Sequence, residues 1–173
     1  SLREQADREA NVGAQLFFCG SGASCIGGAG AFQIPVSTTK SLEEIEGVKS
    51  AIAIGQVTVD ADTAQGRRPI DGVNFDEYSQ MSGIKIMEGR PFANDTDEVI
   101  IDTAFQRQKN FKMGDTLKIW ERDFTIVGTY EPAGGARAKI SRLTMQKQTL
   151  GKESKPEELS KASAILIKIK EGF

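Results

Sequence analysis

The alternation of apolar and polar residues predicts a chain of short strands with a few brief helices between them. Residues 15–19 (QLFFC) form an apolar run suited to a buried strand, and residues 50–60 predict a longer strand. Within the longer strand the apolar positions change parity at Gly55, which predicts a bulge or a bend there. A returning strand is expected over 67–74, and Asp76 is expected to cap the short helix that follows it.

A helix is also predicted in SLEEIEGV, before the longer strand. Ser41 and Glu44 have the spacing of a capping box at its start. Leu42 and Ile45 are expected to face inward as its apolar pair. Gly47 is expected to end the helix after barely two turns.

The best-formed local pattern lies in DEVIIDTAFQRQKNFKMGDTLKIW. Residues 99–101 predict a buried strand, and Asp102 is placed to cap the helix that follows it. Residues 116–120 and 124–128 alternate and predict a hairpin joined by the three residues 121–123. Nothing in this stretch is an obvious catalytic group, so the pattern indicates a scaffold.

The pattern closes with a helix over 141–150 and a strand over 164–170 whose isoleucines share one face. Strands and helices are therefore mixed along the chain, which predicts an α+β domain. At 173 residues, with 39% hydrophobic and 27% charged residues, the chain has the composition of an ordinary globular protein. Its length suits one domain, or two small lobes that share a core.

Charge and composition narrow the classes of function. A net charge of −2 offers no basic face, so no nucleic-acid partner is expected. No apolar run approaches the roughly 20 residues that cross a bilayer. We interpret Ser1 as a cloning remnant, so the sequence is expected to be a piece of a longer protein. The absence of histidine removes the commonest general base and zinc ligand, although enzymes built on Asp, Glu, Lys or Tyr stay open.

Cys19 and Cys25 are the only cysteines, and they lie in a stretch rich in glycine and serine. They allow a small disulfide, two free thiols or half of a metal site. No histidine or second cysteine pair completes a metal site, and a redox pair would have only two residues between its cysteines. In an oxidising compartment a disulfide is favoured, with an entropic contribution of about 2 kcal/mol.

Two glycine-rich stretches predict loops. GSGASCIGG lacks both the phosphate-binding pattern G-x-x-x-x-G-K-[ST] and the dinucleotide pattern G-x-G-x-x-G, so no cofactor is expected. In EPAGGARAK, Gly134 and Gly135 mark an exposed loop, and the charges of Arg137 and Lys139 either meet an acidic partner or simply solubilise it. Gly134, Gly135 and Arg137 are therefore the candidate partner-contact loop.

Acidic residues gather at Asp95, Asp97 and Glu98, which raises the question of a metal or a catalytic site. The segment does not follow the EF-hand pattern, so a solvated turn is favoured over a calcium site and no metal is expected. A general acid/base pair would also need a cleft and desolvation. A carboxylate-based hydrolase is kept as a rival hypothesis, and it would require two acidic residues that converge in a cleft.

The order of several segments carries a family resemblance. They are GVNFDEYSQMSGIKIMEGRPF (72–92), DEVIIDTAFQRQKNFKMGDTLKIWERDFTIVGTY (97–130), a helix with MQKQTLGK, and the strand ASAILIKIK. With the EGRPF step, the MGD turn, the FTIVGTY strand and the upstream EEIEGVKSA, they resemble the extracytoplasmic core domain of MacB-like and FtsX-like ABC transporter permeases. The resemblance extends over most of the chain.

The resemblance implies a non-catalytic, two-lobed domain at the cell membrane, facing the periplasm or the cell exterior. A βαβ-type lobe near the membrane would comprise residues 1–74 and 129–173, incomplete at its C-terminal side. A small α/β lobe of residues 75–128 would be inserted into it.

The resemblance also implies partners and a mode of action. The expected partners are the transmembrane helices of the permease, a cytoplasmic ATPase in a separate domain or subunit, and a periplasmic adaptor or a second permease copy. ATP-driven motion in the cytoplasm would reach the domain mechanically and serve substrate extrusion or a partner outside the membrane. The alternative is a free-standing secreted or periplasmic binding module.

Overall fold

Strands dominate the fold, which is taken from a computed structural model that describes residues 16–18, 34–60, 67–131, 137–150, 161–162 and 164–170. The helices are α2 (Thr38–Glu43), α3 (Phe75–Ser82), α4 (Thr103–Lys109) and α5 (Arg142–Leu150). The strands are β1 (Leu16–Phe18), β2 (Ile34–Pro35), β3 (Val48–Asp60), β4 (Arg67–Val73), β5 (Lys85–Gly89), β6 (Glu98–Asp102), β7 (Thr116–Ile119), β8 (Arg122–Glu131), β9 (Ala138–Ser141), β10 (Lys161–Ala162) and β11 (Ala164–Ile169). In this part of the chain no helix has the length and apolar character needed to cross a bilayer. The α+β class predicted from the sequence is confirmed.

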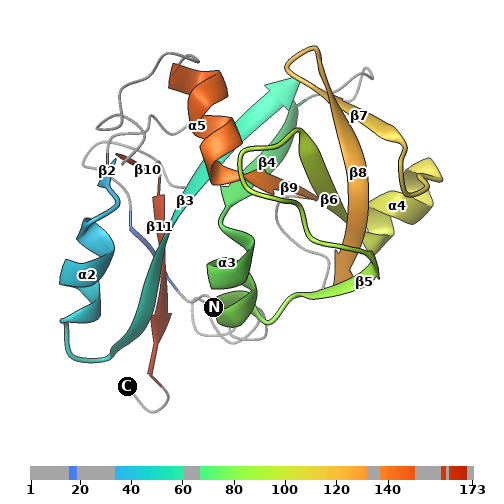
Figure 1. The fold of residues 1–173 in the computed structure, drawn as a ribbon. Coiled ribbons are helices and arrows are strands. Elements are labelled where there is room, and N and C mark those ends of the chain that lie inside the picture. The colour runs from blue at the N-terminus through green and yellow to red at the C-terminus, as the bar shows by residue number, and fades with distance from the viewer. Residues whose placement is uncertain are drawn as a thin grey trace.

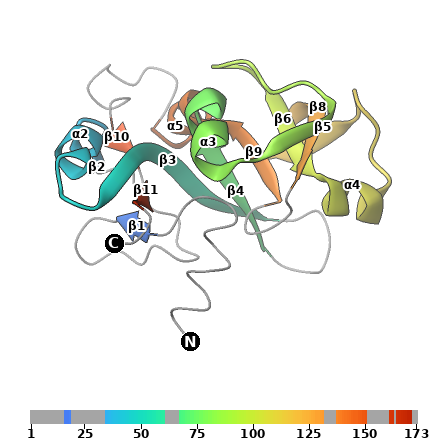
Figure 2. The ribbon, with the colours of Figure 1, turned by 90° about the horizontal axis from the view of Figure 1, so that it is seen from below.

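In the part of the chain that the structure describes, one mixed sheet of nine strands forms the framework of the fold (Figure 1). Its order is β1-β11-β3-β4-β9-β6-β8-β5, and β7 pairs with β8. The β4–β9 and β6–β8 pairs are parallel, and the other pairs are antiparallel. Strands β2 and β10 form a separate antiparallel pair. Helices α2 and α4 lie toward opposite ends of the sheet, and α3 and α5 lie between them (Figure 2).

Strand β3 is the longest element and changes neighbour along its length. Its first part, up to Ile54, pairs with β11, and its second part, from Gly55 onward, pairs with β4. Neither pairing shifts its register at Gly55, so the predicted bulge is wrong, while the alternative of a bend stays a prediction. The apolar parity changes because both faces of the strand are buried: Ile54 and Val57 point to opposite faces and pack in different cores.

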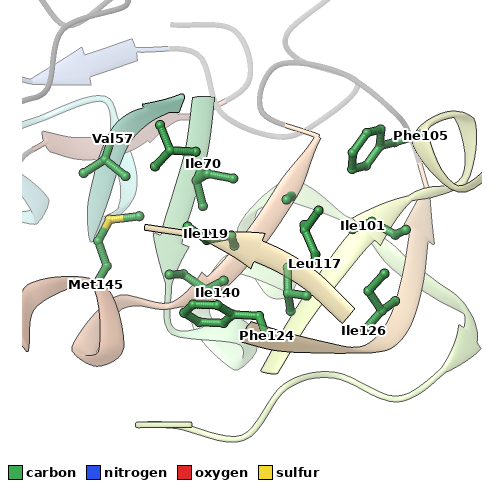
Figure 3. Close-up of a cluster of buried hydrophobic side chains, with 13 residues drawn as sticks. Val57, Ile70, Ile101, Phe105, Leu117, Ile119, Phe124, Ile126, Ile140 and Met145 are labelled. Atoms are coloured by element: carbon green, nitrogen blue, oxygen red, sulfur yellow. The ribbon is translucent and has the colours of Figure 1, made fainter. Parts of the chain in front are cut away.

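Three apolar clusters stabilise the sheet. The first core covers one face, with side chains converging from β3, β4, β6, β7, β8, β9, α4 and α5 (Figure 3). The second core lies on the other face beneath α3. It comprises Ile54, Val73, Met81, Ile84, Phe92, Ile100, Tyr130, Ala164 and Leu166. The third core joins β11 to β2 and β3, and the predicted isoleucine face of β11 is confirmed there.

Two helix starts differ from the sequence prediction. Helix α2 begins at Thr38 after Ser37, so Ser41 lies inside the helix and does not cap it. Ile45, expected to face inward, lies beyond the helix end with 53% of its surface exposed.

Helix α3 is capped by Asn74, whose side chain accepts a hydrogen bond from the Glu77 amide at 3.4 Å. The cap is Asn74 and not the predicted Asp76, because the backbone of Asn74 is extended where β4 ends, as a capping residue requires.

The predicted hairpin is present, with a tighter connection than expected. Strands β7 and β8 pair with Leu117 opposite Phe124, and Trp120 and Glu121 alone form the turn. Both turn residues have positive φ, 54° and 58°, as the tightest hairpin turns require. The connection is therefore two residues long, not three, because Arg122 already pairs with Ile119.

Candidate functional site

The EGR step at the end of β5 approaches the backbone of β8 closely. Gly89 has φ +75°, and a Cβ atom at this position would lie 2.0 Å from the Val127 carbonyl oxygen. The Arg90 amide donates a hydrogen bond to that same oxygen at 2.9 Å. Only glycine allows this approach, since any side chain would collide with the backbone of β8. The close approach of the two strands therefore explains why the EGR motif has glycine at position 89.

An ion pair closes the segment between β5 and β6. The Arg90 guanidinium donates to both carboxylate oxygens of Glu98, with Nη1 3.0 Å from Oε1. Glu98 Oε1 also accepts the Ala93 amide at 2.9 Å. Hydrogen bonding to Arg90 lowers the pKa of Glu98 to about 2. Phe92, inside this closed segment, is buried in the second core.

The other acidic residues of this region are also paired. Asp97 Oδ2 accepts a hydrogen bond from Arg122 Nε at 2.8 Å, and Asp95 Oδ2 accepts one from Lys147 Nζ at 2.7 Å. The predicted solvated turn is thus held by cations from β8 and α5. Within the described ranges no group of three His, Cys, Asp or Glu side chains is arranged to hold a metal ion.

Asp102 performs the capping role predicted from the sequence. Its Oδ1 accepts the Phe105 amide at 2.6 Å, and the residue is almost fully buried at the end of β6. The bond satisfies one of the free amides of the first turn of α4 and so directs Phe105 into the first core.

The most unusual feature is a buried ion pair between two neighbouring strands, which the sequence did not predict. Lys139 was expected in the exposed loop EPAGGARAK, but it lies in β9 with 2% of its surface exposed. Its Nζ donates to Asp71 Oδ2 in β4 at 2.8 Å. The side-chain Nε2 of Gln56 in β3 donates to the other carboxylate oxygen of Asp71, Oδ1, at 3.4 Å. The prediction fails because β9 is a central strand with β4 on one side and β6 on the other.

Two tyrosine rings complete the surroundings of Lys139. Its Nζ lies 4.7 Å from the ring centroid of Tyr78 in α3 and 5.3 Å from that of Tyr130 in β8. Burial alone would lower the pKa of Lys139, but the interactions of its ammonium group with Asp71, Tyr130 and Tyr78 together outweigh burial and hold the pKa well above its usual value. Lys139 is therefore a cation at neutral pH, and a protonated amine is neither a nucleophile nor a base.

Of the candidate partner-contact loop, the structure describes Arg137. Its side chain is exposed and donates to Gln108 Oε1 of α4 at 2.7 Å, and its carbonyl accepts the Asp102 amide at 3.0 Å. Gly134 and Gly135 lie outside the described residues. Cys19 and Cys25 lie outside them as well, so the loop and the disulfide stay predictions.

A sequence signal for the buried pair existed but was weak. Lys139 stands between Ala138 and Ile140, and Asp71 stands between Ile70 and Gly72, so each charge interrupts a short run of apolar or small residues. Such an interruption normally indicates a solvent-facing side of the strand. These two positions are buried because α3 covers them and because each charge is paired with the opposite charge on the neighbouring strand.

Comparisons with protein families and with solved structures find matches to the same kind of domain. The profile of the MacB-like periplasmic core domain matches residues 3–173. The periplasmic region of MacB from Actinobacillus actinomycetemcomitans has a similar fold, with 16% identity, a TM-score of 0.61, and coverage of 91% of this chain and 74% of that one. The extracellular domain of the ABC-type transporter YknZ from Gram-positive bacteria shows 14% identity and a TM-score of 0.58, covering 90% and 83% of the two chains. No curated protein sequence matches the chain.

Proposed function

The chain belongs to the MacB-like periplasmic core domain family and is an extracytoplasmic domain of an ABC transporter permease, and on this premise we propose that it couples ATP-driven motion to events outside the membrane. The domain is non-catalytic and binds no cofactor, and the ATPase is a separate cytoplasmic domain or subunit. Motion arriving through the transmembrane helices serves substrate extrusion or a partner protein, either a periplasmic adaptor or a second permease copy.

The family match carries the proposal, and it favours a permease domain over a free-standing binding module. The sheet supports the mechanical part. Strands β1 and β11 are antiparallel neighbours with Leu16 opposite Ile167, so the described chain enters and leaves at the same end of this strand pair. From there, backbone hydrogen bonds continue through successive strands to β5. A continuous sheet with apolar cores on both faces resists bending and suits a body that transmits motion.

We divide the domain as the family resemblance implies. Residues 1–74 and 129–173 make up the membrane-near lobe, and residues 75–128 make up the inserted lobe. The sheet order supports the division, because β5, β6 and β7 all lie beyond β9, away from β1 and β11. Strand β8 belongs to both parts, since it runs from Arg122 to Glu131.

The buried ion pair of Asp71 and Lys139 supports a structural role over a catalytic one. Lys139 is fully engaged by a carboxylate and two aromatic rings. A catalytic lysine needs a lowered pKa and an approach for substrate, whereas this one has a raised pKa and almost no exposed surface. The carboxylates of Asp97 and Glu98 are likewise paired with arginines.

The test uses the complete transporter reconstituted in lipid vesicles, with spin-labelled noncanonical amino acids that leave Cys19 and Cys25 untouched. One label pair joins Lys109 of α4 to the membrane-spanning part. A second pair joins Lys109 to Lys40 of α2, at the opposite end of the sheet; both lysines are exposed. Distances are measured by pulsed electron paramagnetic resonance without nucleotide and with a non-hydrolysable ATP analogue.

The expected result is a change in the distance from Lys109 to the membrane with no change in the distance from Lys109 to Lys40. That combination describes a domain moving as one body in response to nucleotide. If the distance from Lys109 to the membrane is the same in both states, the coupling proposal is wrong.

A further inference from the structure

The two halves of the sheet meet at one short strand pair. In the described part of the chain, β1, β11, β3 and β4 form one half, and β9, β6, β8, β7 and β5 form the other. Among the strand pairings, only that of β4 with β9 joins them, through four residue pairs that run from Ile70 opposite Ala138 to Val73 opposite Ser141. Helix α5 spans the same junction, since it packs against β3 and β4 on one side and β9 on the other. A body that transmits motion across the sheet must transmit it through this junction.

Apolar contacts cross the junction on both faces but do not define its geometry. On one face Ile70 and Ile140 pack in the first core, and on the other face Val73 and Ile100 pack in the second. Hydrophobic attraction depends on buried area and has little directional preference. Such contacts hold the halves together but fix their relative orientation less sharply than directional contacts do.

Directional contacts at the junction are polar. Asp71 and Lys139 are direct neighbours across it, and their ion pair is largely shielded from water, since both residues are buried. The rings of Tyr78 and Tyr130 bring α3 and β8 against the same ammonium group. A second polar tie comes from Arg142 of α5, whose Nη1 donates to the Ala53 carbonyl of β3 at 2.9 Å.

We propose that Asp71 and Lys139, here called the junction pair, fix the two halves of the sheet as one rigid body, so that motion entering one half reaches the other undiminished. The inference rests on the proposed coupling function and names the contact on which it depends. The junction pair is a positioning device: it contacts no substrate and acts by preventing the β4–β9 pairing from yielding.

The experiment removes the charges while keeping the interior filled. In the complete transporter, Asp71→Leu and Lys139→Met are combined, which replaces the ion pair by apolar side chains of similar size. The matched control combines Glu98→Leu and Arg90→Met. That control removes another ion pair, between Glu98 of β6 and Arg90, which directly follows β5, so both partners lie in the β9 half of the sheet. Circular dichroism melts establish that each variant is folded.

The readout is the width of the distance distribution between spin labels at Lys40 and Lys109, one in each half. The junction variant is expected to broaden this distribution about twofold, and the control variant is expected to keep the wild-type width. A folded junction variant with the wild-type width overturns the inference. If the double replacement does not fold, Asp71→Asn, which keeps the shape and removes the charge, is judged by the same criterion.

Failure of this inference is separable from failure of the proposed function. Coupling is judged in the wild-type transporter from the nucleotide-dependent distance between Lys109 and the membrane. The junction pair is judged from the width of the Lys40–Lys109 distribution without nucleotide. Either result can therefore be negative while the other is positive.

Discussion

Replacing Gly89 by alanine tests the closure of the EGR step around β8. Gly89 has φ +75°, and an added Cβ would lie 2.0 Å from the Val127 oxygen and 2.9 Å from Gly128 Cα. Both neighbours are backbone atoms, so they cannot rotate away as a flexible side chain would. Gly83 provides a matched control, because it has φ +71° and an added Cβ would meet nothing within 4 Å.

The structure separates two costs. A left-handed backbone costs an L-residue about 1–2 kcal/mol, and this cost is shared by Gly83→Ala and Gly89→Ala. Gly89→Ala must also push β5 away from β8, which breaks the 2.9 Å bond from the Arg90 amide and leaves the Val127 carbonyl without that donor. This second cost is about 2–3 kcal/mol. Gly89→Ala should therefore destabilise the domain by about 2–3 kcal/mol more than Gly83→Ala.

Urea denaturation of the wild type and both variants measures the difference, followed by circular dichroism and tryptophan fluorescence. Trp120 is the only tryptophan and packs against Phe124 at the start of β8, so its fluorescence reports on the unfolding of β8, the strand against which β5 packs. The expected thermal counterpart is a melting temperature about 4–12 °C lower for Gly89→Ala than for Gly83→Ala. Equal free energies of unfolding for the two variants would refute the argument, since the close approach would then carry no cost.

Two further predictions concern Glu98 and Arg137. The pKa of Glu98 is lowered from 4.5 to about 2 by Arg90, so its ion pair contributes stability above pH 4.5 and loses that contribution as the pH falls toward 2. The stability difference between the wild type and Glu98→Gln should therefore vanish over this range in acid-denaturation curves, and a difference independent of pH would contradict it. For the candidate partner-contact loop, a photo-crosslinking amino acid at Arg137 in the complete transporter should form adducts with a second permease copy or an adaptor, identified by mass spectrometry. The same amino acid at Arg107, an exposed arginine of α4, is the control, and equal yields at the two positions would reject the loop as a contact.

Local chemistry made several elements readable in the sequence. Asp102 caps α4 as predicted because the amide that it satisfies lies only three residues away. The isoleucines of β11 share a face because successive side chains of any strand alternate. The hairpin of β7 and β8 follows from two alternating runs with a few residues between them, and the length of its turn was missed by one residue. Such features need no knowledge of the rest of the fold.

Predictions failed where a distant segment decides the outcome. Gly55 suggested a bulge because Ile54 and Val57 have opposite parity, yet both faces of β3 are covered by cores assembled from later parts of the chain. Ser41 had the spacing of a cap, but α2 begins after Ser37. For Arg90 the sequence showed a family motif and for Glu98 an acidic cluster, and only the structure showed that the two side chains close the segment between β5 and β6.

The sequence by itself determined the strand periodicity, the cap of α4, the hairpin and the order of segments that identifies the family. These properties depend on neighbouring residues and on their order along the chain. The tertiary structure alone decided the surroundings of Lys139, because Asp71 lies 68 residues before it and reaches it only once β9 enters the sheet between β4 and β6. The same lysine in an exposed loop would carry a solvated charge; beneath α3 it becomes a buried cation at the one strand pair that joins the two halves of the described sheet.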